Sequence, residues 1–198
     1  MDVSLSSVLI IILAPLLLLL CFLVRVTSAG PALFRQERLG QHMRPFTMLK
    51  LRTMRTDNDD SIHREYVTRM LSADQHKAGR DGLFKLDGDR RITPLGRWLR
   101  RSSLDELPQL FNVLRGDMSI VGPRPVLPWE AKLFGVDYQD RFQVKPGITG
   151  LWQVSGRNRL SMQQALELDV EYALRQSLAL DLMILLRTAP AVLRGGAR

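Results

Sequence analysis

The N-terminal part of the chain is dominated by an apolar run of 17 residues, Val8 to Val24, with a proline near its middle. As a helix, this run would measure roughly 26 Å at about 1.5 Å per residue. The hydrocarbon core of a bilayer is about 30 Å thick, so the run is at the lower limit for a straight crossing. Pro15 lacks an N–H group and disfavours helical backbone at Ala14, which predicts a kink or break there. The run is therefore either a short crossing helix or a re-entrant helix that turns back at this point.

A secretory signal peptide is the main alternative for this segment. Such a peptide carries a basic region before its apolar run, whereas residues 1–4 contain an acidic residue and no Lys or Arg. Small residues at 27–30 could form a cleavage site. Positive charge begins only at Arg25, so the positive-inside rule predicts that the rest of the chain lies in the cytoplasm. We therefore expect a membrane-inserted helix over 1–27 and a cytoplasmic domain over 28–198.

The charge balance indicates a partner rich in phosphate. The chain has 28 Lys and Arg against 20 Asp and Glu, a net charge of +8. Such an excess suits nucleic acid, anionic lipid or a nucleotide, and it also suits a solvated surface next to lipid. The sequence has no zinc-finger spacing, no basic region followed by heptads and no aromatic RNA-binding strand, so nucleic acid is not the expected partner. Cys21, the only cysteine, lies inside the apolar run, which excludes a disulfide framework and a thiolate metal site.

Turn and capping signals outline the remaining elements. Residues 34–54 read as two short extended segments around Gly40 and Pro45. The polar stretch 61–72 favours a surface helix. Thr93 followed by Pro94 is a helix start with an N-cap and proline at the first position.

Two further helices are expected. The first covers about 106–114 and ends at Gly116. The second begins with a capping box of Ser161 and Gln164, and its final part, 178–193, is apolar enough for a core helix or one at the membrane interface. We expect a helix-rich α+β single domain with a small β element, a broken membrane helix and interfacial amphipathic helices.

The most suggestive polar feature is the pair Asp105-Glu106. Acidic residues often occupy the first turn of a helix, which is a purely structural interpretation. A capping box of Ser103 and Glu106 would place Pro108 where the helix needs an N–H, whereas a helix starting near Asp105 keeps Pro108 in the first turn. Both carboxylates would then lie at a helix N-terminus with lowered pKa, and would suit a metal ligand or a nucleophile.

Arginines surround this pair in the sequence. They are Arg90, Arg91, Arg97, Arg100, Arg101, Arg115 and Arg124. Charge balance accounts for part of this, but ionised carboxylates among arginines are also what a phosphate-bearing substrate requires. Two like unit charges at 4 Å repel by about 4 kcal/mol at an effective dielectric near 20, and a divalent cation with Arg or Lys can reverse that sign.

Long blocks of the sequence resemble one enzyme family. They are GPALFRQ (30–36), KLRTM (50–54), RRITPLG (90–96), LRRSSLDELPQL (99–110), GDMSIVGPRP (116–125) and PGITGLWQVSGR (146–157). In this order they are similar to the small monotopic phosphoglycosyl transferases, bacterial sugar transferases that start lipid-linked glycan assembly. The resemblance implies a bacterial inner-membrane enzyme that works at the cytoplasmic face.

The resemblance also implies a reaction and a site. A phosphosugar would pass from a nucleotide diphosphosugar, usually a UDP-sugar, to polyprenyl phosphate, with UMP released and a covalent Asp-phosphosugar intermediate. The catalytic dyad falls on Asp105, as nucleophile and Mg²⁺ contact, and on Glu106. The phosphate-binding positions fall on Lys50, Arg100, Arg124 and Arg157. The re-entrant break falls on Ala14-Pro15, where the family often has Ser-Pro, so a hydroxyl that could bond freed backbone is absent. The alternative is a membrane-anchored basic module that binds anionic lipid or nucleic acid without catalysis.

Overall fold

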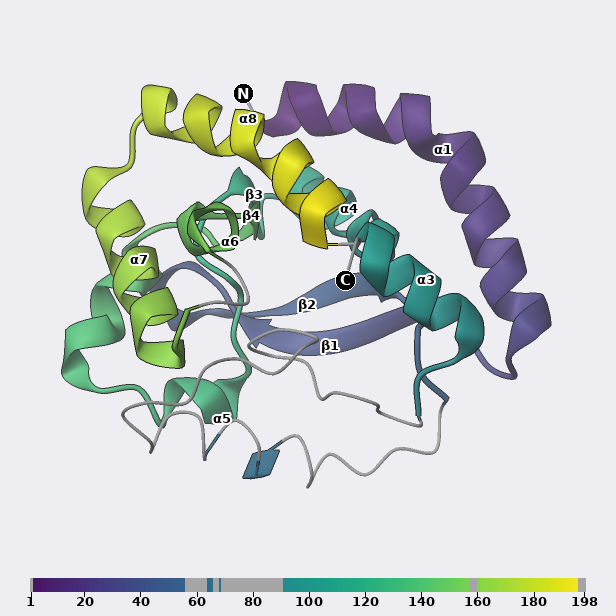
Figure 1. The fold of residues 1–198 in the computed structure, drawn as a ribbon, viewed down its shortest axis with the longest axis horizontal. Coiled ribbons are helices and arrows are strands. Elements are labelled where there is room, and N and C mark those ends of the chain that lie inside the picture. Colours follow the sequence, from purple (N-terminus) through teal and green to yellow (C-terminus); the bar gives the residue numbers. More distant parts are fainter. Residues whose placement is uncertain (1, 56–63, 66–67, 69–90, 157–159, 196–198) are drawn as a thin grey trace.

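The computed structural model describes residues 2–55, 64–65, 68, 91–156 and 160–195. They form a helix-rich α+β fold, as the sequence predicts (Figure 1). The helices are α1 (Asp2–Thr27), α3 (Pro94–Ser102), α4 (Gln109–Arg115), α5 (Pro128–Ala131), α6 (Leu151–Ser155), α7 (Met162–Arg175) and α8 (Leu178–Gly195). The 3₁₀ segments are η1 (Gln41–Met43), η2 (Leu104–Glu106) and η3 (Val136–Gln143). The helix expected over 61–72 lies almost wholly outside the described residues.

The strands make two small sheets. β1 (Leu33–Leu39) and β2 (Pro45–Leu51) are the two expected extended segments, and the structure pairs them as an antiparallel hairpin. β3 (Ser119–Val121) and β4 (Gly147–Thr149) pair in parallel, joining two segments that are far apart in the sequence. The hairpin packs against α4 through β2, and η3 and α6 both pack against α7 (Figure 1).

Local capping signals confirm several predicted boundaries. The Thr93 hydroxyl accepts a hydrogen bond from the Gly96 N–H at 2.9 Å, so α3 begins as the Thr-Pro signal predicts. Ser161 and Gln164 form the predicted capping box at the start of α7. Gly116 ends α4 at a φ of 85°, a left-handed conformation that glycine adopts without steric cost.

The prediction of one last long helix is wrong in one respect, because this part of the chain forms two helices. α7 ends at Arg175 and α8 begins at Leu178, and the ribbon changes direction between them (Figure 1). Gln176 leaves the helical conformation with φ −48° and ψ 124°. Ser177 then starts α8, since its hydroxyl accepts from the Leu180 N–H at 3.3 Å. A serine N-cap inside an otherwise helical stretch was the signal for this boundary.

The apolar N-terminal segment forms a single bent helix. α1 is assigned without interruption through Pro15, so the predicted distortion is a bend near mid-helix rather than a break (Figure 1). By length and composition α1 could cross a membrane, and only 17% of its most apolar window is buried in the protein. Leu20 and Val24 nevertheless pack with Leu51 and Leu99 in one core cluster. The helix is thus an element of the folded domain.

Both ends of α1 contact the rest of the domain. Near its start, Ser6 is fully buried, and the Ile120 N–H lies 3.5 Å from the Asp2 carboxylate. Just beyond its end, the Arg52 guanidinium donates to the carbonyls of Ser28 and Ala29 at 2.7 and 2.6 Å. Both ends of α1 are therefore held against the same folded domain.

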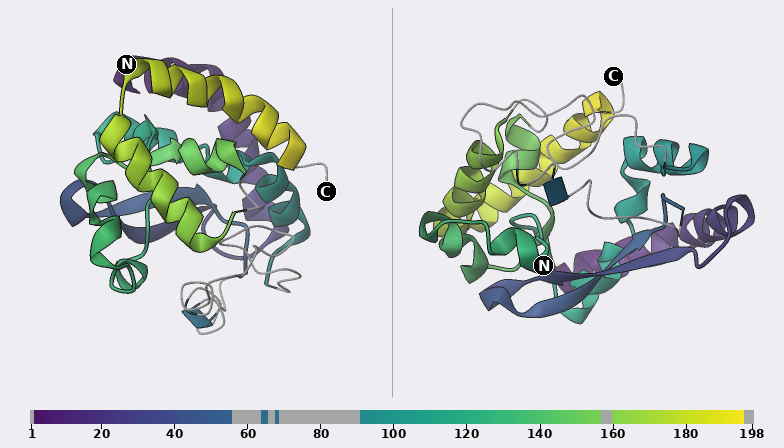
Figure 2. Two further views of the ribbon diagram at one scale, coloured as in Figure 1. Left: turned by 60° about the vertical axis from the view of Figure 1, so that its left-hand side comes forward. Right: turned by 90° about the horizontal axis from the view of Figure 1, so that it is seen from below.

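An exposed apolar surface runs over α1 and α8. On α1, Ile11 and Leu18 are 74% and 71% exposed. On α8, Leu178 and Leu186 are exposed while Ile184 is fully buried, so this helix has one face for the core and another apolar face outside. The first half of α1 and α8 lie along the same side of the molecule (Figures 1 and 2). This distribution is what a membrane-facing surface requires.

Candidate active site

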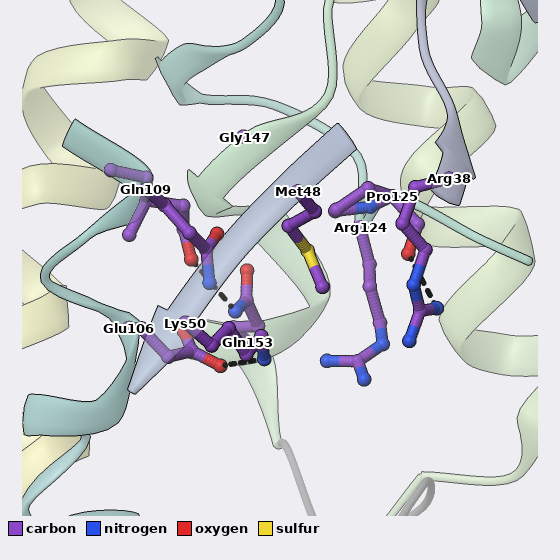
Figure 3. A pocket seen from close by; sticks show the side chains of 10 residues that line it. Arg38, Met48, Lys50, Glu106, Gln109, Arg124, Pro125, Gly147 and Gln153 are labelled. Atoms are coloured by element: carbon purple, nitrogen blue, oxygen red, sulfur yellow. Dashed lines mark hydrogen bonds and ion pairs between the residues drawn. The ribbon is translucent and has the colours of Figure 1, made fainter. Parts of the chain in front are cut away.

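A small pocket lies between β2, η2 and the segment after β3 (Figure 3). Four charged side chains line it together with polar and apolar ones. The lining residues are Arg38, Met48, Lys50, Glu106, Gln109, Arg124, Pro125, Gly147, Ile148 and Gln153. In the close-up, Lys50 and Glu106 lie on one side, Arg124 and Arg38 on the other, and Met48 between them (Figure 3). Three of the residues expected at the site, from segments far apart in sequence, therefore meet in one pocket.

The acidic pair lies in a tight turn between two helices. Ser103 ends α3 in a left-handed conformation, φ 57°, and the 3₁₀ turn η2 follows directly. The α-helical start expected near Asp105 is wrong, since α4 begins at Gln109 and Pro108 occupies its N-cap position. The capping box of Ser103 and Glu106, which the position of Pro108 argued against, is absent, because the Ser103 side chain makes no cap hydrogen bond. The two carboxylates therefore lie in a 3₁₀ turn that leads into α4, not in the first turn of an α-helix.

Lys50 and Glu106 form an ion pair inside the pocket. The Lys50 Nζ lies 2.9 Å from Glu106 Oε1, and the two side chains are 17% and 25% exposed. Asp105 is 8% exposed in the same turn and is not among the described residues that line this pocket. The Lys50 ammonium group thus contacts the Glu106 carboxylate directly.

Asn112 fixes the strand that carries Lys50. Its side chain is fully buried, accepts from the Leu49 N–H at 3.0 Å and donates to the Thr47 carbonyl at 2.7 Å. An amide that satisfies one donor and one acceptor on a strand edge replaces a missing neighbouring strand. Because Asn112 is on α4, it sets the distance between β2 and the acidic turn that precedes this helix.

The other expected phosphate ligands differ in placement. The Arg100 Nε donates to the Thr53 hydroxyl at 2.8 Å, and Arg100 is not among the described residues that line the pocket. Arg157 lies outside the described residues. Arg124 lines the pocket from the Gly-Pro-Arg-Pro segment, 122–125.

Close glycine contacts hold that segment against β4. A Cβ atom on Gly122 would lie 2.3 Å from the Lys145 carbonyl oxygen, and one on Gly147 would lie 2.1 Å from the Gly122 nitrogen. Two hydrogen bonds cross the junction, from Gly122 N–H to the Thr149 carbonyl and from Gly147 N–H to the Pro123 carbonyl. Glycine is required here because the two backbones touch.

The structure adds residues that the sequence did not single out. Arg38 and Gln109 line the pocket and are 7% and 2% exposed, and Gln153 lines it from α6. Burial lowers the pKa of Arg38 to about 10, an effect that Glu130 opposes and Arg124 reinforces, so Arg38 remains charged at neutral pH. No sequence pattern marks a strand arginine as buried, so Arg38 carried no signal. Gln109 did carry one, because it directly follows the Leu-Asp-Glu-Leu-Pro block.

The charges of the pocket suit a phosphate ligand with a hard cation. Arg38, Lys50 and Arg124 supply positive charge and Glu106 supplies a carboxylate, while Asp105 lies beside Glu106 in the same turn. Among the described residues, no group of three or more His, Cys, Asp or Glu side chains could hold a metal by itself. Mg²⁺ commonly takes only one or two carboxylates and completes its shell with water and substrate phosphate, so this donor set fits it. Together with the exposed apolar helices, these features suit a site that binds a phosphate-bearing substrate next to a membrane.

Comparison with known proteins identifies the family. A family model described as bacterial sugar transferase matches residues 1–195, and the chain belongs to this family, whose members are membrane-associated sugar transferases. The chain is 39% identical over 191 residues to the exopolysaccharide production protein ExoY of Rhizobium meliloti, with 96% of this chain and 83% of that protein covered.

Two further relatives carry names that describe a reaction. The chain is 42% identical to a UDP-glucose:undecaprenyl-phosphate glucose-1-phosphate transferase of Caulobacter vibrioides, covering 98% of this chain and 68% of the relative. It is 41% identical to an undecaprenyl-phosphate galactose phosphotransferase of Salmonella typhimurium, covering 98% of this chain but 40% of that longer protein. The chain is therefore a transferase, which sets aside the alternative of a non-catalytic basic module.

Proposed function

We propose that the chain transfers a sugar phosphate from a UDP-sugar to polyprenyl phosphate at a membrane surface and releases UMP. The observation that carries this proposal is the single pocket in which Lys50, Glu106 and Arg124 meet beside Asp105. Its charges suit a diphosphate, and two named relatives use undecaprenyl phosphate as acceptor.

The proposed chemistry is covalent. A carboxylate oxygen of Asp105 attacks the phosphorus that carries the sugar, and the bond from this phosphorus to the bridging oxygen breaks, releasing UMP. A phosphate oxygen of the lipid acceptor then attacks the acyl phosphate, the bond to Asp105 breaks, and the carboxylate is regenerated. Lys50 and Arg124 hold the phosphates, Arg100 and Arg157 remain expected contacts from the family resemblance, and Glu106 orients Lys50. Asp105 and Glu106 would hold Mg²⁺, which offsets the repulsion between the carboxylate and the substrate phosphates.

The nucleotide product separates this reaction from ordinary glycosyl transfer. We would incubate the full chain in detergent with undecaprenyl phosphate, magnesium chloride and a panel of UDP-sugars, beginning with UDP-glucose and UDP-galactose. Release of UMP with formation of a polyprenyl diphosphate sugar is the expected result. Release of UDP would show that the sugar leaves without its phosphate and would refute the proposal.

The proposal includes a re-entrant α1 on the cytoplasmic face. A helix that crossed the bilayer would hold its N-terminal end about 30 Å away from the domain. The contacts of Asp2 with Ile120 and of Arg52 with Ser28 keep both ends at the domain and so support entry and exit on one side. The cluster of positive charge after the apolar run supports the cytoplasmic side.

Cysteine labelling tests this topology. Ser4 is exposed near the start of α1, so Ser4→Cys in a Cys21→Ala background should react with an impermeant maleimide only after cells are permeabilised. Arg175→Cys, with its 73% exposed side chain on α7, is the matched cytoplasmic control. The cysteines at positions 4 and 175 should both become labelled only after permeabilisation. Labelling of position 4 in intact spheroplasts, with position 175 protected, would instead establish a crossing helix.

A further inference from the structure

The segment that carries Arg124 is held from two sides by buried arginines. The Arg141 Nη2 donates to the Arg124 carbonyl at 2.8 Å, and the Arg38 Nη1 donates to the Pro125 carbonyl at 3.2 Å. Arg141 comes from η3 and Arg38 from β1, so two separate elements bind consecutive carbonyls of one short segment. The Leu39 N–H adds a third bond, to the Val126 carbonyl at 2.9 Å.

Each of these arginines has its own buried carboxylate. Arg141 pairs with Asp169 of α7 at 2.5 Å, and these side chains are 2% and 4% exposed. Arg38 pairs with Glu130 of α5 at 3.5 Å, with side chains 9% and 2% exposed. Burial raises the pKa of Asp169, and the Arg141 charge opposes that rise. Arg141 is therefore held by Asp169, and Arg38 by Glu130 together with the Gln36 side-chain carbonyl, to which its Nη2 donates at 2.7 Å.

Stability alone is a poor explanation for this arrangement. Removing two charges from water costs several kcal/mol per ion, and buried ion pairs are often no better than apolar residues of the same size. The Arg141 pair is also incompletely satisfied, because Arg141 Nε, Arg141 Nη1 and Asp169 Oδ1 are buried and lack a hydrogen-bond partner in the described structure. A planar guanidinium that joins a carboxylate to a backbone carbonyl does, however, fix geometry well. The rings of Phe134 and Phe142, 5.3 and 5.4 Å from the Arg141 guanidinium carbon, restrict it further.

We propose that Arg38 and Arg141 are positioning residues, which set where the Arg124 side chain meets the donor diphosphate through the carbonyls of Arg124 and Pro125. This inference rests on the proposed function in one point, the phosphate contact of Arg124. It predicts that the effect of changing Arg141 on ligand binding passes through Arg124 and disappears when the Arg124 side chain is removed.

A double-mutant cycle measures that dependence. Arg141→Lys keeps a charge beside Asp169 but is shorter and lacks the planar fork. Binding of UDP with magnesium chloride to the full chain would be followed by calorimetry, with thermal unfolding as a check on folding. Arg124→Ala should raise the Kd for UDP by about tenfold, because a charged hydrogen bond is lost. Arg141→Lys should raise it about fivefold in the parent, and less than about twofold in the Arg124→Ala background.

The surface pair of Arg175 and Glu171 supplies the control. Its atoms lie 2.7 Å apart but its side chains are 73% and 43% exposed, so Arg175→Lys should leave the Kd unchanged in both backgrounds. An equal rise of the Kd with and without the Arg124 side chain, or no rise at all in folded Arg141→Lys, would overturn the positioning role.

Two further outcomes are distinguishable. If Arg141→Lys does not fold, Arg38→Lys enters the same cycle, and an additive loss there would show that Arg38 touches the ligand itself. If Arg124→Ala binds UDP as the parent does, the diphosphate contact assigned to Arg124 is wrong and this inference falls with it. The release of UMP in the turnover assay would still test the proposed reaction independently.

Discussion

Asp105→Asn is expected to abolish sugar-phosphate transfer while the domain stays folded. Asparagine has nearly the same shape as aspartate, so the 8% exposed side chain still fits its turn. It lacks the anionic oxygen that would attack phosphorus, and loss of a nucleophile lowers kcat by roughly 10³-fold or more. Turnover is measured as UMP release, and folding as the thermal unfolding midpoint.

Mass spectrometry of the intact protein and of its proteolytic peptides tests the same residue more directly. The parent, incubated with the UDP-sugar and magnesium chloride but no lipid acceptor, should gain the mass of one phosphosugar on the peptide that contains Asp105. Asp105→Asn should gain none. Glu106→Gln, which removes the charge that pairs with Lys50, should slow formation of the adduct without moving it to another peptide. Strictly sequential kinetics with no adduct in the parent would leave the two carboxylates as metal ligands in a direct transfer.

Gly147→Ala is expected to destabilise the domain by about 3 kcal/mol or more, because the new methyl group meets only backbone. It would lie 2.1 Å from the Gly122 nitrogen and 2.5 Å from the Thr149 carbonyl oxygen, and neither atom can move as a side chain end can. Relief requires β4 and the Arg124 segment to separate, which breaks the hydrogen bonds that join them. At this chain length the loss corresponds to a midpoint lower by roughly 6–12 °C.

Gly135→Ala is the matched control for that experiment. A Cβ atom there has nothing within 4 Å, and the backbone φ of −65° suits any residue. The control should unfold at the parent's temperature or slightly above, since alanine restricts the unfolded chain. Equal stability of Gly147→Ala and Gly135→Ala would mean that the close glycine junction does not exist in solution.

Features that depend on neighbouring residues were predictable from the sequence. The Thr93 hydroxyl and the Gly96 N–H, and the Ser161 and Gln164 pair, lie three positions apart, so a local pattern is enough to specify their hydrogen bonds. The apolar run specified a helix for the same reason. The start of α4 was misjudged because a 3₁₀ turn and a left-handed Ser103 leave no distinct residue signal.

The assembly of the site was decided by tertiary structure. The ion pair of Lys50 and Glu106 joins residues 56 positions apart, and the bond from Arg38 to Pro125 spans 87. Contacts of this range exist only after β2, α4 and the Gly122–Gly147 junction have packed, so no local pattern contains them. The family resemblance named Lys50 and Arg124, but Arg38 and Arg141 became visible only through their burial. By itself the sequence determined the local elements and the chemistry available to them. Packing determined which charges meet in the pocket and that both ends of α1 return to the domain, because these depend on side chains that the chain brings together only when folded.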